Sequence, residues 1–358
     1  MKVLIACGGT GGHLSPGIAV AQELTARGHR CKLLISEKRV DQALCGAYPE
    51  LEFIPLSGIG FSKKLSNLPR CLWAAFKNIA QSFRLLNQTK ADAVIGFGGF
   101  TNVGIVLAAK FLHKPCFLHE ANRIPGRAVR TLGRWATTVY VPEIFQKQHL
   151  RMKVCGFPIR REFQKLDKAV AKKELGFDPK KLLLVVVGGS QGARVLTQWA
   201  RKHSGDFKRH DIQLLCLTGV RNSGENTEVT ASFASDLSFR FIPFCHQMHL
   251  VYSAADVVIG RAGAGTIAEL TVCETPSILV PLPTSADGHQ LANARAFEQQ
   301  GGCVCLEQND LPKLWEKVHE LLSDKEKRAE ISKRLRTLNT IDATRMMVTD
   351  IERILGTV

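Results

Sequence analysis

The sequence contains no apolar run that could cross a membrane, since none approaches the roughly 18 consecutive apolar residues that such a span needs. Only five apolar residues separate Lys2 from Gly8, which is too few for the core of a secretion signal. Low-complexity tracts are absent too, and a chain with 45% hydrophobic and 22% charged residues has the composition of an ordinary globular protein. We therefore expect a cytoplasmic protein.

Paired cysteines are missing as well. The eleven cysteines form no CxxC pair, and only Cys303 and Cys305 lie close together. Zinc sites and disulfide frameworks need such pairs, so buried free thiols are expected. There is also no Asp-x-Asp pair and no cluster of histidine and cysteine. We expect no metal site and no cofactor.

Two common nucleotide-binding motifs are absent. A P-loop requires Gly-Lys followed by Ser or Thr, and no such lysine is present. The dinucleotide fingerprint GxGxxG also fails, because Gly9 and Gly11 are followed by Leu14 where the third glycine should stand. These absences disfavour hydrolysis of nucleoside triphosphates and hydride transfer.

Acidic residues are scarce in one half of the chain. Residues 1–160 hold 22 Lys and Arg against 8 Asp and Glu, a net charge of +14, whereas residues 161–358 hold 26 against 24. No acidic residue occurs from Phe53 to Ala91. The first half should therefore carry a strongly positive surface with an anionic partner.

The chain repeats itself weakly. The segment "LLLVVVGGSQGA" (182–193) resembles the opening "VLIACGGTGGH", and "ADVVIGRAGAGT" (255–266) resembles "ADAVIGFGGFT" (91–101). A length of 358 residues also fits two domains of roughly 150 residues. Each copy alternates short apolar runs with amphipathic segments, which predicts two doubly wound α/β domains whose ligands lie at the carboxyl ends of the strands.

The glycine turns point to anion binding. A strand, a glycine turn and a helix direct backbone N–H groups toward one spot, which suits a phosphate or diphosphate. "GGTGGH" (8–13) and "GGSQGA" (188–193) both follow this pattern. His13 ends the first turn, where it either accepts a proton from a substrate or only hydrogen-bonds the turn. Glu269 could accept two ribose hydroxyls or be an ordinary surface carboxylate.

Seven motifs occur together along nearly the whole chain. They are "GGTGGH" (8–13), "GFGGF" (96–100), "HEANRIPGRA" (119–128), "GFPIR" (156–160), "GGSQGA" (188–193), "RAGAGTIAE" (261–269) and "DGHQLANA" (287–294). In this order they resemble the MurG family, the N-acetylglucosaminyltransferases that make the last cytoplasmic intermediate of bacterial peptidoglycan. The resemblance implies the GT-B fold, in which two Rossmann-like domains face an inter-domain cleft.

The resemblance also implies a domain plan. Residues 1–160 would bind the acceptor and associate with the membrane, and residues 161–340 would bind UDP-GlcNAc. Residues 341–358 would form a C-terminal helix that packs back toward the N-terminal domain.

Site residues follow from the same resemblance. Cys245 would meet the uracil through its backbone, and Glu269 the ribose. Ser190 and Thr266 would bind the diphosphate, together with the neighbouring amides of Ala264, Gly265, Ile267 and Ala268. Asn122 and Gln290 would hold the sugar, Arg160 would add charge near the diphosphate, and Thr10, Gly11 and Gly12 would close the site.

The implied reaction is an inverting transfer of GlcNAc from UDP-GlcNAc to the 4-hydroxyl of lipid I, undecaprenyl-diphosphate-MurNAc-pentapeptide, which forms lipid II. His13 resembles the base proposed for the family. The alternatives are another GT-B activity on a UDP-sugar, including a UDP-GlcNAc epimerase, and a basic nucleic-acid-binding protein. Because the basic half shows no nucleic-acid module, we expect no nucleic acid partner.

The segment "RCLWAAFKNIAQSFRLL" (70–86) predicts an amphipathic helix. Trp73, Phe76 and Phe83 share one side, and Arg70, Lys77 and Arg84 border it at seven-residue steps. Such a face suits an anionic bilayer, although a core helix shows the same stripe. The first interpretation predicts peripheral association with the cytoplasmic face of the bacterial inner membrane.

Overall fold

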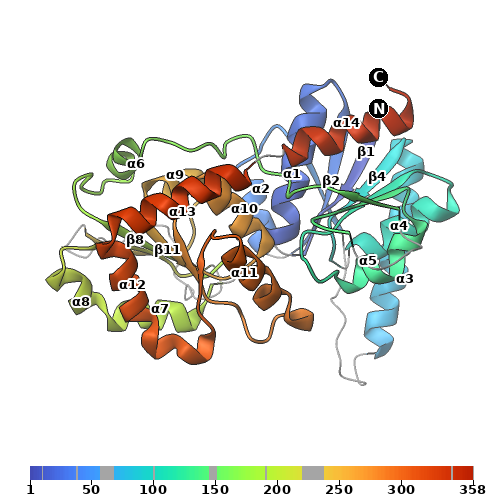
Figure 1. The fold of residues 1–358 in the computed structure, drawn as a ribbon. Coiled ribbons are helices and arrows are strands. Elements are labelled where there is room, and N and C mark those ends of the chain that lie inside the picture. The colour runs from blue at the N-terminus through green and yellow to red at the C-terminus, as the bar shows by residue number, and fades with distance from the viewer. Residues whose placement is uncertain are drawn as a thin grey trace. The chain divides into compact units, whose positions relative to one another are not determined.

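The computed structural model describes most of the chain. The described residues are 1–9, 11–37, 39–56, 68–99, 101–144, 151–189, 192–219, 238–339 and 342–357, without the side chains of residues 39, 40, 43 and 68–72. The chain divides into two compact units (Figure 1). Unit 1 comprises Met1–Arg161 and Ile341–Val358, and unit 2 comprises Glu162–Thr340. These divisions lie within one residue of the boundaries expected from the sequence.

Unit 1 alternates strands with helices. Its strands are β1 (Lys2–Ala6), β2 (Arg30–Ser36), β3 (Glu52–Leu56), β4 (Ala93–Gly96), β5 (Cys116–His119), β6 (Thr138–Val141) and β7 (Met152–Val154). Its helices are α1 (Gly11–Ala26), α2 (Arg39–Cys45), α3 (Leu68–Thr89), α4 (Thr101–Phe111), α5 (Arg127–Leu132), the 3₁₀ turn η2 (Gly133–Trp135) and α14 (Ala343–Leu355).

The strands of unit 1 form one parallel sheet in the order β3-β2-β1-β4-β5-β6-β7. Its central strands are apolar on both faces, as a parallel sheet covered by helices requires. Leu4, Leu34 and Val94 pack on one face against Leu86 of α3 and Ile105 of α4. The carboxyl ends of β1, β4 and β5 therefore lie side by side at one edge of this sheet.

Helices α3 and α4 approach closely at Gly104. A Cβ at Gly104 would lie 2.2 Å from Asn78 Oδ1 and 2.8 Å from Ser82 Oγ, so no larger residue fits without movement. Asn78 Oδ1 accepts the Gly104 amide at 3.1 Å. Asn78, Ser82 and Leu86 are buried and four residues apart, so they mark the side of α3 that faces the core.

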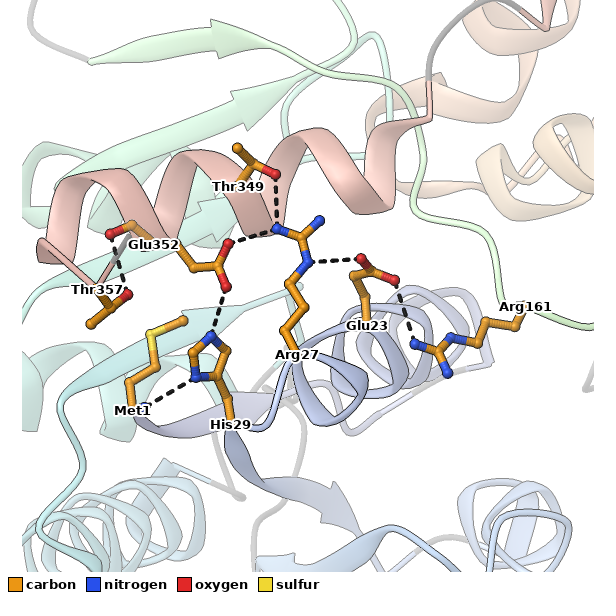
Figure 2. Close-up of polar contacts among 8 residues, drawn as sticks. All are labelled: Met1, Glu23, Arg27, His29, Arg161, Thr349, Glu352 and Thr357. Atoms are coloured by element: carbon orange, nitrogen blue, oxygen red, sulfur yellow. Dashed lines mark hydrogen bonds and ion pairs between the residues drawn. The ribbon is translucent and has the colours of Figure 1, made fainter.

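The last helix of the chain, α14, lies in unit 1 against α1 (Figure 2). Arg27 follows α1, and its guanidinium donates to Glu352 Oε2 at 2.6 Å and to Glu23 Oε1 at 2.8 Å. His29 Nε2 lies 2.7 Å from Glu352 Oε1. Arg161, the last residue of the first segment of unit 1, lies 3.5 Å from the other oxygen of Glu23. This network ties the end of the chain to its beginning.

Two further contacts hold α14 on the sheet of unit 1. Asp350 is buried and accepts hydrogen bonds from Tyr140 Oη at 3.0 Å and from Lys153 Nζ at 2.6 Å. Tyr140 lies on β6 and Lys153 on the edge strand β7, so one carboxylate joins α14 to the last two strands of the sheet.

Unit 2 repeats the plan of unit 1. Its strands are β8 (Leu183–Val187), β9 (Gln213–Leu217), β10 (Phe239–Ile242), β11 (Val257–Gly260), β12 (Ser277–Leu279) and β13 (Val304–Cys305). Its helices are α6 (Lys168–Glu174), α7 (Arg194–Lys202), α8 (Ser204–Arg209), α9 (Met248–Ala254), α10 (Ala264–Val272), α11 (His289–Gln299), α12 (Leu314–Ser323) and α13 (Lys325–Leu338), with the 3₁₀ turns η4 (Ala286–Gly288) and η5 (Gln308–Lys313).

The second sheet is parallel in the order β10-β9-β8-β11-β12-β13. The strands within the repeated motifs hold equivalent positions in the two sheets. In the strand order, β8 takes the place of β1, and β11 takes the place of β4. The prediction of two doubly wound α/β domains is confirmed. The cysteines that the structure describes carry free thiols, most of them buried, and none of the described helices is both long and apolar enough to span a membrane.

Candidate active site

The glycine turn after β1 is held from within unit 1. Gly9 has a φ of +127°, which disfavours any residue with a side chain. The amides of Cys7 and Gly8 both donate to the Leu34 carbonyl at 3.1 Å, and the Gly9 amide donates to Asp41 Oδ2 at 2.9 Å. Three successive amides are therefore directed into the protein and not toward a ligand.

The anion site predicted for this turn must therefore use the amides that come later. Gly11 and Gly12 open α1, and amides in the first turn of a helix have no acceptor within it. Thr10 lies outside the described residues. The predicted contacts of these three residues with a substrate stay predictions.

His13, in the first turn of α1, lies against a wall of glycine backbone. A Cβ at Gly98 would stand 2.8 Å from His13 Nε2, and one at Gly99 would stand 3.3 Å from Nδ1. A Cβ at Gly9 would stand 3.9 Å from Nδ1. The "GGTGGH" and "GFGGF" motifs thus meet at one imidazole. A side chain at Gly98 would displace the ring and one at Gly99 would collide with the Gly8 carbonyl, whereas Gly9 is required by its positive φ.

Two polar residues at the start of α4 connect these glycine turns. Thr101 Oγ1 donates to the Gly8 carbonyl at 3.1 Å. The buried amide of Asn102, oriented so that its nitrogen donates to the Ala6 carbonyl at 3.1 Å, accepts the Gly98 amide at 2.6 Å. The two turns beside His13 are therefore one hydrogen-bonded assembly.

His119, at the end of β5, is buried near His13. Its Nε2 donates to the Gly156 carbonyl at 3.0 Å. Burial lowers the pKa of His119 to about 4, the hydrogen bond to Gly156 opposes this shift, and His13 lowers the pKa further. His119 is therefore neutral at physiological pH, with its proton on Nε2.

The buried carboxylate of Glu120 shapes the loop that carries Asn122. Its Oε1 accepts the backbone amide of Asn122 at 2.9 Å and the side-chain Nδ2 at 3.1 Å, and its Oε2 accepts the Gly126 amide at 2.6 Å. The amide group of Asn122 is therefore oriented by Glu120. The predicted contact of Asn122 with the sugar stays a prediction.

Arg160 has a structural partner in unit 1. Its side chain is buried, and Nη1 donates to Tyr48 Oη at 2.7 Å. The structure thus places this guanidinium beside a phenol in the interior of unit 1. Its predicted proximity to the diphosphate stays a prediction.

In unit 2 the sheet order gathers the other predicted residues. Because β8 lies between β9 and β11, the turns after β10, β8 and β11 share one edge of the sheet. Cys245 follows β10, is partly buried, and has a pKa raised by burial and lowered in part by a backbone hydrogen bond. Ser190, after β8, lies outside the described residues.

Helix α10 starts at the end of β11. Gly263 precedes it in an extended conformation, and the first helical hydrogen bond runs from the Ile267 amide to the Gly263 carbonyl. The amides of Ala264, Gly265 and Thr266 consequently have no acceptor within the helix. They form the positive end of its dipole.

Arg261 and Glu269 flank this helix start differently. The guanidinium of Arg261, whose pKa is lowered by burial, donates to the carbonyls of Val280 and Pro281 at 3.0 and 3.2 Å. It therefore joins the turn after β11 to the end of β12.

Glu269 is partly buried and lies three residues after Thr266, on the same side of α10. Ile267 and Ala268 lie in the same helix, partly buried.

Gln290, at the start of α11, braces a neighbouring loop. Its Oε1 accepts the Leu282 amide at 3.0 Å. Asn293, one turn later, donates to the Ala262 carbonyl at 3.4 Å, so α11 is connected to the turn before α10. The predicted contact of Gln290 with the sugar stays a prediction.

Sequence reasoning missed the residues that hold these turns. They are Asp41, Thr101, Asn102, Glu120 and Arg261. The one available signal was their position in the chain, because Glu120 and Arg261 directly follow a strand and Thr101 opens a helix. Most of their partners are backbone groups, and those of Asp41 at Gly9, Thr101, Asn102 and Arg261 are distant in sequence, so no local pattern reveals them.

The comparisons with known proteins agree with this geometry. Residues 3–141 match the glycosyltransferase family 28 N-terminal domain, and residues 183–344 match the glycosyltransferase family 28 C-terminal domain. A UDP-N-acetylglucosamine–N-acetylmuramyl-(pentapeptide) pyrophosphoryl-undecaprenol N-acetylglucosamine transferase from Opitutus terrae is 41% identical, over 99% of this chain and 95% of the relative. The chain belongs to this transferase family. It is a glycosyltransferase.

Other family members and solved structures extend the comparison. A transferase of the same name from Caldanaerobacter subterraneus is 34% identical over 96% of this chain and 97% of its own. The crystal structure of Acinetobacter baumannii MurG is 26% identical, with a TM-score of 0.71 over 98% of this chain and 99% of that one. A putative UDP-N-acetylglucosamine 2-epimerase from Listeria monocytogenes shares the fold, with a TM-score of 0.73 over 100% and 97% of the chains, but only 14% identity. The predicted GT-B fold is confirmed.

Proposed function

We propose that this transferase moves GlcNAc from UDP-GlcNAc to the 4-hydroxyl of the muramyl sugar in lipid I and so forms lipid II. The observation that carries this proposal is the 41% identity with a transferase of that name over 99% of the chain. Fold similarity alone could not select it, because the putative epimerase superposes as well as the MurG structure does. An epimerase would need no acceptor.

The reaction is a single inverting displacement. The acceptor oxygen forms a bond to the anomeric carbon while the bond from that carbon to the diphosphate breaks, and UDP leaves with the electron pair. His13 takes the proton of the attacking hydroxyl. The glycine wall supports this role, because backbone groups at Gly98 and Gly99 lie directly against the imidazole and define its position. Neutral His119 does not add a second positive charge.

Unit 2 binds the donor in this proposal. The amides of Ala264, Gly265 and Thr266 are suited to the diphosphate, whose charge grows as the bond to the sugar breaks. Glu269 accepts the ribose hydroxyls from the same side of α10. The backbone of Cys245 contacts the uracil, and Gln290 contacts the sugar.

The proposal is tested with labelled UDP-GlcNAc and a lipid I analogue. We expect a labelled disaccharide-lipid product, and UDP release that depends on the acceptor. The control omits the acceptor and analyses the nucleotide sugar. Conversion of UDP-GlcNAc to its epimer without acceptor, or no transfer by folded protein, would reject the proposal.

The N-terminal unit binds an anionic membrane surface, where a lipid-linked acceptor resides. Trp73 and Phe76 are 68% and 63% exposed, and their rings stack 6.0 Å apart. Trp73 and Phe76 do not lie on the side of α3 that faces the core. That side carries the buried residues Asn78, Ser82 and Leu86. This arrangement favours the membrane interpretation of the stripe over the core interpretation.

The other residues of the stripe divide between core and surface. Phe83 is partly buried against the core and contacts Phe111, which is itself 68% exposed and extends the aromatic surface. Lys77 and Arg84 are exposed, whereas the Arg70 side chain lies outside the described residues. The net charge of +14 in residues 1–160 would attract this surface to anionic lipids.

A further inference from the structure

Asp41 is a carboxyl group that is fully buried at the ends of two strands. It lies in α2, and its exposed fraction is 0%. Its Oδ2 accepts the amide of Gly9 at 2.9 Å, the amide of Ser36 at 3.1 Å and the Ser36 hydroxyl. Gly9 follows β1 and Ser36 ends β2. One oxygen therefore joins the catalytic glycine turn to the neighbouring strand.

The surroundings of Asp41 make its burial unfavourable for the stability of the folded protein. Its second oxygen is buried too and has no hydrogen-bond partner among the residues that the structure describes. The pKa of Cys7 is raised by burial and by Asp41, and so is that of Cys45, to about 12. Burying a carboxyl group among thiols and apolar residues costs stability, since only one of its oxygens is well satisfied.

The contact with Gly9 bears directly on His13. Gly9 has a left-handed φ and stands beside the imidazole, since a Cβ on it would lie 3.9 Å from Nδ1. Gly98 and Gly99 form the rest of the wall. Asn102 accepts the Gly98 amide, and Thr101 donates to the Gly8 carbonyl. Asp41 holds the remaining side. Without Asp41, the Gly9 amide would lose its carboxylate acceptor, and the imidazole would lose part of its support.

We propose that Asp41 is a positioning residue for the transfer, which acts by holding the Gly9 amide and thereby the imidazole of His13. The inference rests on the proposed role of His13 as the base. A misplacement of about 1 Å at a reacting group lowers the rate by about 10²-fold, so even a small shift of the turn would be measurable. Asp41 should have little effect on donor binding, because the groups proposed to bind the ribose and the diphosphate lie mainly in unit 2.

The test compares two substitutions close in shape. Asp41→Val removes the acceptor, and we expect kcat to fall about 10- to 100-fold with the KM for UDP-GlcNAc unchanged. Asp41→Asn keeps an acceptor oxygen, and we expect kcat within about threefold of wild type although the protein is less stable. Ser36→Ala is the matched control, because it removes one donor to the same oxygen but leaves Gly9 held.

Stability and activity are measured together on these variants. If Asp41 is a positioning residue, the effects on stability and on kcat should differ between the variants. Asp41→Asn should lose stability and keep kcat, whereas Asp41→Val should lose kcat. A folded Asp41→Val protein with normal kcat would overturn the proposal, as would an equal loss of kcat in both variants or a matching rise in KM. A wild type that makes no product would instead reject the proposed function.

If Asp41→Val does not fold, Asp41→Ser replaces it in a double-mutant cycle with His13→Ala. We expect Asp41→Ser to lower kcat at least threefold in the wild-type background and to have no effect when His13 is absent. The same loss in both backgrounds, or no loss in the first, would show that Asp41 does not act through His13.

Discussion

At the scale of single residues, His13 is distinguished by what surrounds it. Glycine backbone at three positions lies beside its ring, so backbone groups largely define the position of the imidazole. Backbone walls are stiffer than side-chain walls, because they are held by hydrogen bonds such as those of Thr101 and Asn102. This arrangement suits a group that must meet a substrate hydroxyl in one orientation.

Replacing His13 with Ala should lower turnover and leave donor binding intact. General-base catalysis contributes about 10²- to 10⁴-fold, so kcat should fall by that order while UDP binds normally. The acid limb of the pH–rate profile should also disappear, because the titrating imidazole is gone. Steady-state kinetics and calorimetry with UDP measure both. Near-normal turnover in the folded variant would remove His13 as the base.

His119 should make the protein less stable in mild acid. Its pKa is about 4 in the folded state, and an unfolded histidine has a pKa of about 6.5. Between these values the unfolded chain binds a proton that the folded protein does not, so stability falls as pH falls from about 6.5 to 4. The loss amounts to about 2 kcal/mol at pH 5 and about 3 kcal/mol at pH 4.

Urea unfolding between pH 7 and pH 5 checks this expectation against His119→Gln, whose side-chain nitrogen can still donate to Gly156. The stability advantage of wild type over the variant should shrink by about 2 kcal/mol over this range. Parallel curves for the two proteins would mean that His119 does not titrate as burial predicts.

At the scale of elements, α3 shows how one amphipathic helix serves two surfaces. Its polar Asn78 and Ser82 are buried because α4 approaches at Gly104, where only small or hydrogen-bonding groups fit. Trp73 and Phe76 are consequently left on the outside. The helix therefore presents two aromatic rings to the surroundings of unit 1, while Leu86 and part of Phe83 pack on its core.

Trp73→Glu combined with Phe76→Glu should abolish binding to anionic vesicles. The change removes two apolar contacts and adds two negative charges, and we expect at least about a tenfold loss of affinity. UDP affinity should not change. Asn87→Glu with Gln88→Glu is the matched control, since it adds the same charge to exposed positions later in α3. Cosedimentation equal to wild type in the aromatic variant would show that this surface does not bind lipid.

At the scale of the whole molecule, the chain returns to its first domain after completing its second. Glu352 of α14 is buried between Arg27 and His29 (Figure 2). Asp350 reaches Tyr140 of β6 and Lys153 of β7. Residues separated by more than 300 positions thus stabilise one another. The integrity of unit 1 depends on the last residues of the chain.

Glu352→Gln should destabilise unit 1. Burial raises the pKa of Glu352, but His29 and Arg27 outweigh it and leave the pKa below its usual range, so the contribution is present above about pH 4.3 and lost as pH falls through the lowered value. We expect a loss of about 1–3 kcal/mol at pH 7. Urea unfolding measures it, with the exposed Glu50→Gln as control. A loss no larger than that of the control would show that the network does not hold α14.

The sequence by itself determined the architecture and the family. Strands that are apolar on both faces, glycine turns after them and the repeated motifs are local properties, so they are legible without coordinates. They placed β1 and β8, β4 and β11, and the helices that follow them. Seven motifs in order identified the transferase, because each records a backbone or ligand requirement at one point of the chain.

Tertiary structure alone decided which groups hold those motifs in place. The bond from Gly9 to Asp41, the contact of His13 with Gly98, and the return of Glu352 to Arg27 join residues that lie far apart in sequence. A parallel sheet brings such residues together because its crossovers place the ends of distant strands at one edge. Whether a stripe faces the core depends likewise on the partner helix, which for α3 is set by Gly104 and not by α3 itself.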